Sequence, residues 1–153
     1  MQRPYQQNND RLDEVAGQCS KPPYVILLMD DEESILDSYA KLLEIKGFIV
    51  YTACNGEQAI DVYHQALSSG RAVDVAIIDL TIPDGMGGNE TVARIKEIDP
   101  DVRAIATTGH FQDCLTDECK KSGFVGILPK PYLLKELLEA IDRVIRTERK
   151  NPE

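Results

Sequence analysis

Apolar residues along the chain fall into two alternating patterns. Short, mostly apolar runs, typical of strands in the middle of a sheet, occupy 24–29, 48–51, 73–78, 102–107 and 124–128. Between and after them, apolar residues recur every three or four positions, as on one face of a helix, over 33–46, 56–69, 89–98 and 133–145, and more weakly over 112–122. This alternation predicts an α/β domain whose parallel sheet is covered by helices on both faces.

Residues that begin or end helices support these boundaries. Asn55 is suited to cap the start of the second helix, and Gly47 lies where the first helix should end. The third helix should stop at Asp99 and Pro100, because proline cannot continue a helix. The boundaries therefore agree with the apolar periodicity.

The two ends of the chain differ from this central part. Residues 1–23 are polar and offer no face to bury, which indicates a disordered tail or linker. We expect a single domain over 24–148, followed by a polar C-terminal end at 149–153. The first 20 residues contain no apolar signal-peptide segment, and no apolar run approaches the ~20 residues that span a bilayer. We expect a soluble, cytoplasmic protein.

Charge and cysteine usage exclude several classes of function. The net charge is -9, which argues against direct nucleic-acid binding and against an anionic membrane surface as partner. The excess acidity serves solubility, or part of it forms a local carboxylate cluster. The four cysteines form no CxxC pair, which favours a reducing compartment. The spacing of His110, Cys114 and Cys119 fits no familiar zinc pattern, so the two cysteines are interpreted as small apolar helix residues.

Polar residues follow four of the five predicted strands. In a parallel sheet ligands bind beyond the carboxyl ends of the strands, so these positions are candidates for one site. They are Asp30, Asp31 and Glu32 after the first strand, Asp79 after the third, Thr108 and Gly109 after the fourth, and Lys130 and Pro131 after the fifth.

The acidic members of this set predict a divalent cation. Three neighbouring carboxylates repel one another, and Mg2+ prefers hard oxygen ligands while sharing its shell with water and phosphate. Lys130 adds a point charge that can pair with a phosphoryl oxygen, and Thr108 adds a hydroxyl donor. An alternative is that acidic residues after a strand only cap helices, as Asp31 could for the helix at 33.

Four segments resemble the response-regulator receiver family, and the resemblance covers about residues 24–147. Each segment is weakly specific by itself, whereas their order and spacing together are specific. They are Met29–Glu32, Ile78–Gly88, Ala106–Gly109 and Leu128–Tyr132. The resemblance implies a flavodoxin-like, doubly wound five-stranded parallel sheet of order 2-1-3-4-5 with five helices.

The resemblance also implies a role for each candidate residue. Asp79 corresponds to the phosphoacceptor that takes a phosphoryl group from a histidine kinase or a histidine phosphotransfer protein. With Asp79, the ligands of Mg2+ (or Mn2+) would be Asp30, Asp31 and the backbone carbonyl of Thr81. Thr108 corresponds to the hydroxyl that follows the phosphoryl group, and Gly109 to the small residue that leaves access to it. Lys130 corresponds to the family's lysine, followed by a cis bond to Pro131, with Glu32 as a further pocket residue.

One position departs from the family pattern. The family often has Tyr or Phe three residues before the lysine, and here that residue is Ile127. An aromatic switch coupled to Thr108 is therefore not expected, and the signal would travel by loop and helix shifts. His110 is a candidate modulator of phosphoaspartate hydrolysis, although a solvated loop histidine is the simpler interpretation.

Alternatives to this function remain at the level of sequence. A pseudo-receiver would act as an interaction module without phosphorylation, but such domains commonly lose pocket residues that this chain retains. An Asp-nucleophile phosphatase would want a second acid at the position of Thr81. The expected protein is therefore no enzyme beyond its own phosphorylation and dephosphorylation. It is either a stand-alone regulator or part of a hybrid histidine kinase, with an unknown downstream protein as partner and a homodimer left open.

Overall fold

Five parallel strands form the centre of the molecule. The computed structural model describes residues 23–83, 85–109 and 120–149. The strands are β1 (Val25–Met29), β2 (Ile49–Ala53), β3 (Val75–Asp79), β4 (Ala104–Thr108) and β5 (Phe124–Pro129). Their order in the sheet is β2-β1-β3-β4-β5, and every neighbouring pair is parallel. The predicted fold class and strand order are confirmed.

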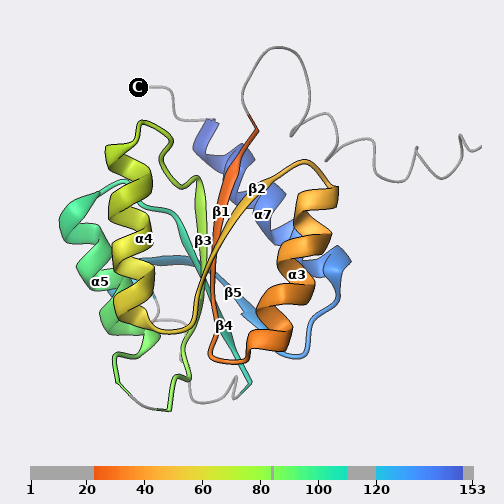
Figure 1. Cartoon of the computed structure of the whole chain (residues 1–153), viewed down its shortest axis with the longest axis horizontal. Coiled ribbons are helices and arrows are strands. Elements are labelled where there is room, and N and C mark those ends of the chain that lie inside the picture. Colours follow the sequence, from red (N-terminus) through yellow and green to blue (C-terminus); the bar gives the residue numbers. More distant parts are fainter. Residues whose placement is uncertain (1–22, 84, 110–119, 150–153) are drawn as a thin grey trace, which may run out of the picture.

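Helices cover both faces of this sheet (Figure 1). One face carries α4 (Gly56–Ser68) and α5 (Gly88–Ile98), and the other carries α3 (Glu33–Ile45) and α7 (Leu134–Arg149). Each face has its own apolar core, because alternate residues of every strand point to opposite sides: Leu27 and Ile78 pack toward α4 and α5, and Leu28 and Ile77 toward α3 and α7.

Most predicted elements occur at shifted boundaries. Asn55 caps α4 as expected, its side chain accepting a hydrogen bond of 2.9 Å from the Gln58 N–H. Leu133, predicted to begin the last helix, instead precedes α7 and is 68% exposed. Its N–H donates to the Glu136 carboxylate at 2.9 Å, an arrangement typical of the residue just before a helix.

Some expectations fall on parts of the chain that the structure does not describe. The proposed tail at 1–23 lies outside the described residues except for residue 23, as does the polar end beyond residue 149. Of the weak helix expected over 112–122, only residues 120–122 are described, and these are helical. Within the described ranges, no helix has the length and apolar character needed to span a membrane.

A buried tyrosine connects α4 to the end of α5, at the amino edge of the sheet. Tyr63 is fully buried, and its hydroxyl donates to the Asp99 carboxylate at 2.5 Å. Burial, followed by the bond to Asp99, raises the pKa of Tyr63 above its ordinary value. A raised pKa means that the stabilisation is fully present below the pKa of the unfolded chain and is lost as the pH rises through the folded value.

Replacing Tyr63 by phenylalanine should therefore have a pH-dependent effect. At neutral pH we expect Tyr63→Phe to lower the free energy of unfolding by about 1.5–3 kcal/mol, the net value of a hydrogen bond to a charged group. Above about pH 10, where an unfolded tyrosine ionises, the difference between the two proteins should shrink. Urea unfolding at a series of pH values measures both quantities, and a constant difference would contradict the linkage.

Candidate functional site

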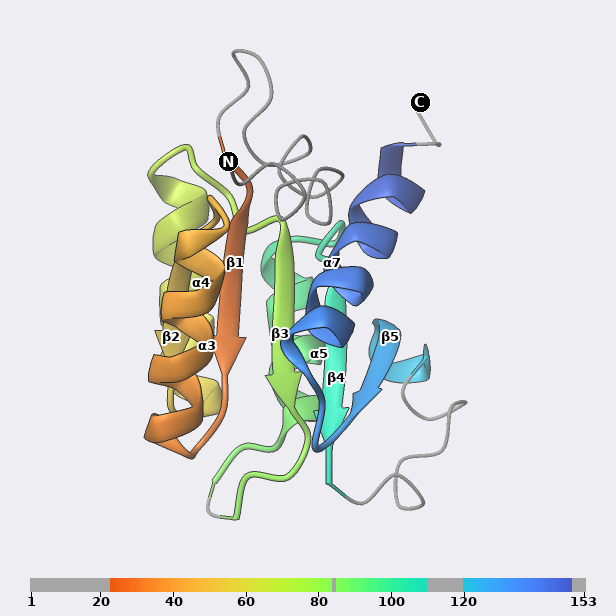
Figure 2. The ribbon, with the colours of Figure 1, turned by 90° about the vertical axis from the view of Figure 1, so that its right-hand side faces the viewer.

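Three carboxylates from two strand ends meet at the carboxyl edge of the sheet. In Figure 2 the arrowheads of β1, β3, β4 and β5 point to the same edge, which is where these residues lie. Asp30 follows β1 and Asp79 ends β3, and both are buried, whereas Asp31 is exposed. One ligand oxygen from each of the three lies within 4.8 Å of the others. The topology thus brings together residues that are 48 positions or more apart in the chain, from Asp31 to Asp79.

Lys130 reaches into this cluster from the end of β5. Its Nζ atom donates to Asp30 Oδ2 at 2.7 Å and to Asp79 Oδ2 at 3.1 Å. The Lys130 side chain is 20% exposed, and the two carboxylates are 6% and 3% exposed. These are charge-assisted bonds in a mostly buried setting, where such bonds are strongest.

For both Asp79 and Lys130, burial shifts the pKa in one direction and the bonds between oppositely charged groups shift it in the other. Burial raises the pKa of Asp79 above its ordinary value, and this effect outweighs the bonds from Thr81 and Lys130, which lower it. For Lys130, burial lowers the pKa, but hydrogen bonds to Asp30 and Asp79 outweigh it and raise the pKa. The lysine is therefore held as a cation, and it partly compensates two carboxylates that would otherwise repel each other.

The donor set fits a small divalent cation. Asp30, Asp31 and Asp79 offer carboxylate oxygens only, which are the ligands that Mg2+ or Mn2+ takes. The exposed position of Asp31 leaves one side of the cluster open to water, as Mg2+ requires because it keeps several waters. The predicted cation site is therefore compatible with the geometry.

The acidic residues that follow β1 do not cap helix α3 with their side chains. The residue that precedes α3 is Glu32, and its side chain makes no capping bond. Asp30 Oδ1 accepts the Glu32 N–H at 2.9 Å, which turns the chain and fixes the Asp30 carboxyl group in the pocket. The alternative interpretation of Asp31 as a helix cap is wrong.

The segment after Asp79 is held close to the acceptor. Asp79 Oδ1 accepts the Thr81 N–H at 2.9 Å, and the loop ends at Gly88, the first residue of α5. A Cβ atom on Gly88 would lie 2.7 Å from the Asp79 carbonyl oxygen and 2.9 Å from Leu80 Cα. The backbone of the acceptor therefore leaves no space for a side chain at position 88.

Adding a methyl group at position 88 should displace the acceptor. We expect Gly88→Ala to lower the free energy of unfolding by about 1–3 kcal/mol, as overpacking does. Gly87→Ala is a matched control, because a Cβ there would meet only Leu80 O, at an ordinary 3.7 Å. Urea unfolding of both variants measures the effect, and equal stability of the two would contradict the steric argument.

The remaining candidate residues lie around the same edge. Thr108 is buried at the end of β4, and its carbonyl oxygen accepts the Lys130 N–H at 2.8 Å. The Lys130–Pro131 bond is cis, as expected. Glu32, Gly109, Lys130 and Pro131 line a groove of about 420 Å3 beside the carboxylates. His110 lies outside the described residues, and Ile127 is half-buried against the core that also contains Ile78.

Two tyrosines at this edge were missed by the sequence analysis. Tyr39 on α3 donates its hydroxyl to the Tyr132 carbonyl at 2.7 Å, and the two rings lie 5.1 Å apart. Tyr39 has helical apolar spacing, so its pattern indicates only a core position. A phenol on the apolar face of a helix is nevertheless a signal, because the hydroxyl of a half-buried tyrosine usually finds a hydrogen-bond partner.

Fold and site together define a class of protein: a doubly wound α/β domain with a carboxylate cluster and a paired lysine ammonium at the carboxyl edge of its sheet. A family model described as the response regulator receiver domain matches residues 26–142. The chain belongs to this family, whose members are receiver domains of two-component systems and whose general function is phosphoryl acceptance.

Curated proteins and solved structures agree with this assignment. The chain is 24% identical to the sensor kinase CckA of Brucella abortus over 80% of its own length but only 13% of the kinase. It is 28% identical to sporulation initiation phosphotransferase F of Bacillus subtilis, covering 78% of the chain and 92% of that protein. A receiver domain structure from Clostridium thermocellum matches with a TM-score of 0.71 at 29% identity, covering 83% of this chain and 98% of that one.

Proposed function

We propose that this domain, residues 24–148, accepts a phosphoryl group on Asp79 in a Mg2+-dependent reaction and thereby changes its binding to a downstream protein. The observation that carries the proposal is the meeting of Asp30, Asp31 and Asp79 with Lys130 in one pocket. A site of this composition carries both the acceptor oxygen and the positive charge that phosphoryl transfer needs.

The chain's own residues supply most of the chemistry. An Asp79 carboxylate oxygen forms the new bond to phosphorus while the bond from phosphorus to the donor's histidine nitrogen breaks. The electron pair of the broken bond stays on that nitrogen, and the product is an acyl phosphate on Asp79. Lys130 Nζ, 3.1 Å from Asp79 Oδ2, can move onto a phosphoryl oxygen. When bound, Mg2+ would neutralise charge on the phosphoryl group.

Residues around the acceptor have supporting roles in this proposal. Asp30, Asp31, Asp79 and the backbone carbonyl of Thr81 would hold the cation. The Thr108 hydroxyl would follow the phosphoryl group, and the exposed Gly109 would leave room for its approach. A phosphoryl group carries about -1.5 to -2 charges in place of the single charge of the carboxylate, which favours inward movement of groups that can donate to it. His110 is proposed only as a modulator of hydrolysis.

The phosphoryl donor is proposed to be a histidine kinase or a histidine phosphotransfer protein. One similar protein is a sensor kinase and another is a phosphotransferase, so both a hybrid kinase and a stand-alone regulator are compatible arrangements. The phosphatase alternative gains no support, because Thr81 stands where a second acid would be needed. The pseudo-receiver alternative is weakened because no pocket residue has been lost.

The experiment is phosphorylation by a small donor. Incubation with acetyl phosphate and Mg2+ should add the mass of one phosphoryl group to the intact protein, and excess EDTA should prevent it. Beryllofluoride with Mg2+ should raise the thermal unfolding midpoint, as a ligand of the folded state does. A protein that takes up no phosphoryl group and does not respond to beryllofluoride would be a pseudo-receiver.

A further inference from the structure

The backbone that carries Lys130 is fixed at two points. On one side, the Lys130 N–H donates to the Thr108 carbonyl at 2.8 Å, which ties the lysine to the end of β4. On the other side, the Tyr39 hydroxyl donates to the Tyr132 carbonyl at 2.7 Å. Tyr132 is two residues beyond the lysine, so the segment 130–132 lies between the two bonds. The second anchor is a side chain of α3, which is 93 positions away in the chain.

The anchor is packed as well as hydrogen-bonded. The rings of Tyr39 and Tyr132 lie 5.1 Å apart at 40°, within the range of favourable aromatic pairs. Together with Asp30 they line a void of only about 10 Å3, at the lower limit for holding one water. Little free space therefore remains where the aromatic pair and Asp30, a carboxylate that pairs with Lys130, line the same void. Burial raises the pKa of the Tyr132 phenol to about 12, with a smaller contribution from Tyr39.

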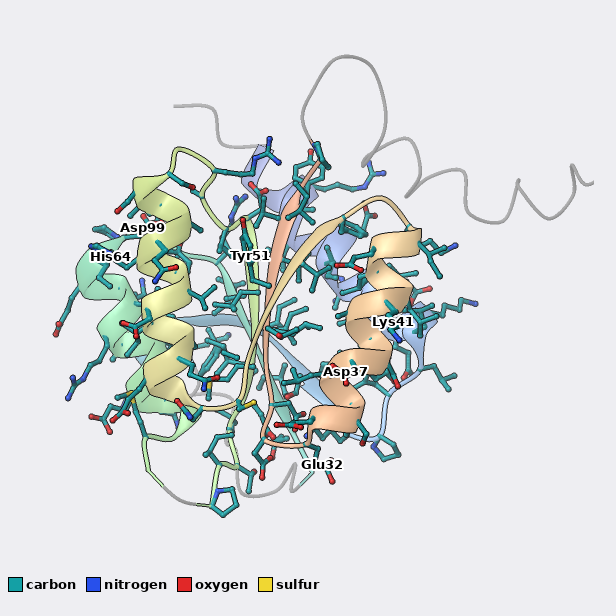
Figure 3. All side chains as sticks on the ribbon, in the orientation of Figure 1. Glu32, Asp37, Lys41, Tyr51, His64 and Asp99 are labelled. Atoms are coloured by element: carbon teal, nitrogen blue, oxygen red, sulfur yellow. The ribbon has the colours of Figure 1, made fainter. Side chains whose placement is uncertain are left out.

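We propose that Tyr39 is a positioning residue for Lys130: its hydroxyl, through the Tyr132 carbonyl, holds the lysine where it can meet the phosphoryl group on Asp79. The inference rests on the proposed function, which supplies the reaction that the lysine assists. Tyr39 touches neither Asp79 nor the phosphoryl group in this proposal. It links helix α3, whose surface carries Asp37 and Lys41 (Figure 3), to the phosphorylation pocket.

The hydroxyl and the ring have separable contributions. Tyr39→Phe keeps the aromatic contact and removes only the donor to the Tyr132 carbonyl. The segment 130–132 then keeps its bond to Thr108 but can move at its other end, so the lysine should spend less time in position. Because one hydrogen bond is involved, we expect the maximum rate of Asp79 phosphorylation by acetyl phosphate at saturating Mg2+ to fall about three- to tenfold.

Tyr63→Phe is the matched control. It is the same substitution, and it also removes a hydroxyl on one helix that donates to a residue at the end of another. Tyr63 bonds to Asp99, beyond the end of α5, and Figure 3 places Asp99 at the opposite end of the molecule from Glu32. Tyr63→Phe should lose at least as much stability as Tyr39→Phe, but only Tyr39→Phe should lose phosphorylation rate.

Two further measurements separate a positioning effect on Lys130 from a general loss of stability. In a Lys130→Met background, Tyr39→Phe should change the rate less than twofold, because a residue that acts through Lys130 has no effect when the lysine is absent. Without Mg2+ or phosphodonor, amide hydrogen exchange at Leu133 should accelerate about three- to tenfold in Tyr39→Phe and remain unchanged in Tyr63→Phe, because it reports local opening of this segment.

The outcomes distinguish this inference from the proposed function. If wild type is never phosphorylated, the proposed function fails. If wild type is phosphorylated and Tyr39→Phe reacts at the same rate, or is slowed only as much as Tyr63→Phe, the positioning role is wrong and the proposed function stands. A full effect of Tyr39→Phe in the Lys130→Met background would likewise overturn it, because the hydroxyl would then act by another route.

Discussion

Asp79→Asn is expected to abolish phosphorylation by acetyl phosphate while making the Mg2+-free protein more stable. The amide has no carboxylate oxygen to attack phosphorus, so the intact mass should remain unchanged under conditions that convert wild type. Asp79 is 2% exposed and its pKa is raised, chiefly by burial. A folded-state pKa above the ordinary value means that stability falls as the pH rises through it, so the charged acceptor destabilises the fold at neutral pH.

The stability effect has a predicted sign in each condition. Without a divalent cation, Asp79→Asn should raise the free energy of unfolding by about 1–2 kcal/mol, as removal of an incompletely compensated buried charge does. With Mg2+ at about 100 times its dissociation constant, wild type should gain about 2.7 kcal/mol, and the variant, which lacks one ligand, should gain less. Urea unfolding with Mg2+ and with EDTA measures both differences.

Asp101→Asn is a suitable control, because Asp101 is exposed beyond α5 on the opposite edge of the sheet. It should be phosphorylated as wild type is, and its response to Mg2+ should be unchanged. Labelling of Asp79→Asn at the wild-type level would remove Asp79 from its proposed role. Equal stabilisation of wild type and Asp79→Asn by Mg2+ would mean that the cation binds elsewhere.

The fold was predictable because each strand is a short, mostly apolar run between segments of helical periodicity. The strands near the middle of the sheet are buried on both faces, so apolar residues such as Ile26 and Ile77 directly predict a buried position. The ends were predicted less well. For β2 the apolar run suggested 48–51, whereas pairing with β1 extends the strand to Ala53, and that pairing depends on contacts distant in the chain.

The candidate site was predictable to the extent that it consists of strand ends. Parallel strands bring Asp30, Asp79 and Lys130 to one edge whatever the loops do. Their roles are still predictions, and the geometry is what supports them. Tyr39 could not be found in the same way, because its partner is a backbone carbonyl. Carbonyl groups are identical at every position of a sequence, so a pattern of side chains cannot show which one a hydroxyl will reach.

Lys130→Met is expected to have the second large effect. It leaves the carboxylates of Asp30 and Asp79, 6% and 3% exposed, without the ammonium that now bonds to both. Methionine preserves much of the side-chain volume, so the loss is mainly of charge. Breaking a buried ion pair from one side costs about 3–5 kcal/mol, and the partial exposure of Lys130 reduces our expectation to about 2–3 kcal/mol in the Mg2+-free protein.

Mg2+ should affect this variant more than wild type. The Lys130 ammonium repels a cation that binds the same carboxylates, since like charges repel. Removing the Lys130 charge should therefore tighten Mg2+ binding. The rate of phosphorylation should nevertheless fall, by about 10²- to 10³-fold, because the charge that develops on the phosphoryl group loses a preorganised donor. Tighter cation binding and slower chemistry in one variant would show that Lys130 serves the transferred group rather than the metal.

Lys130→Arg provides the matched control for charge. It restores a cation, but a planar guanidinium cannot replace the point charge that contacts Asp30 and Asp79 together. We expect Mg2+-free stability closer to wild type than that of Lys130→Met, with phosphorylation still slow. Titration of Mg2+ by calorimetry and labelling rates at saturating Mg2+ measure the two effects. Weaker Mg2+ binding by Lys130→Met would contradict the argument, because the lysine would then be stabilising the cation site instead of competing for its oxygens.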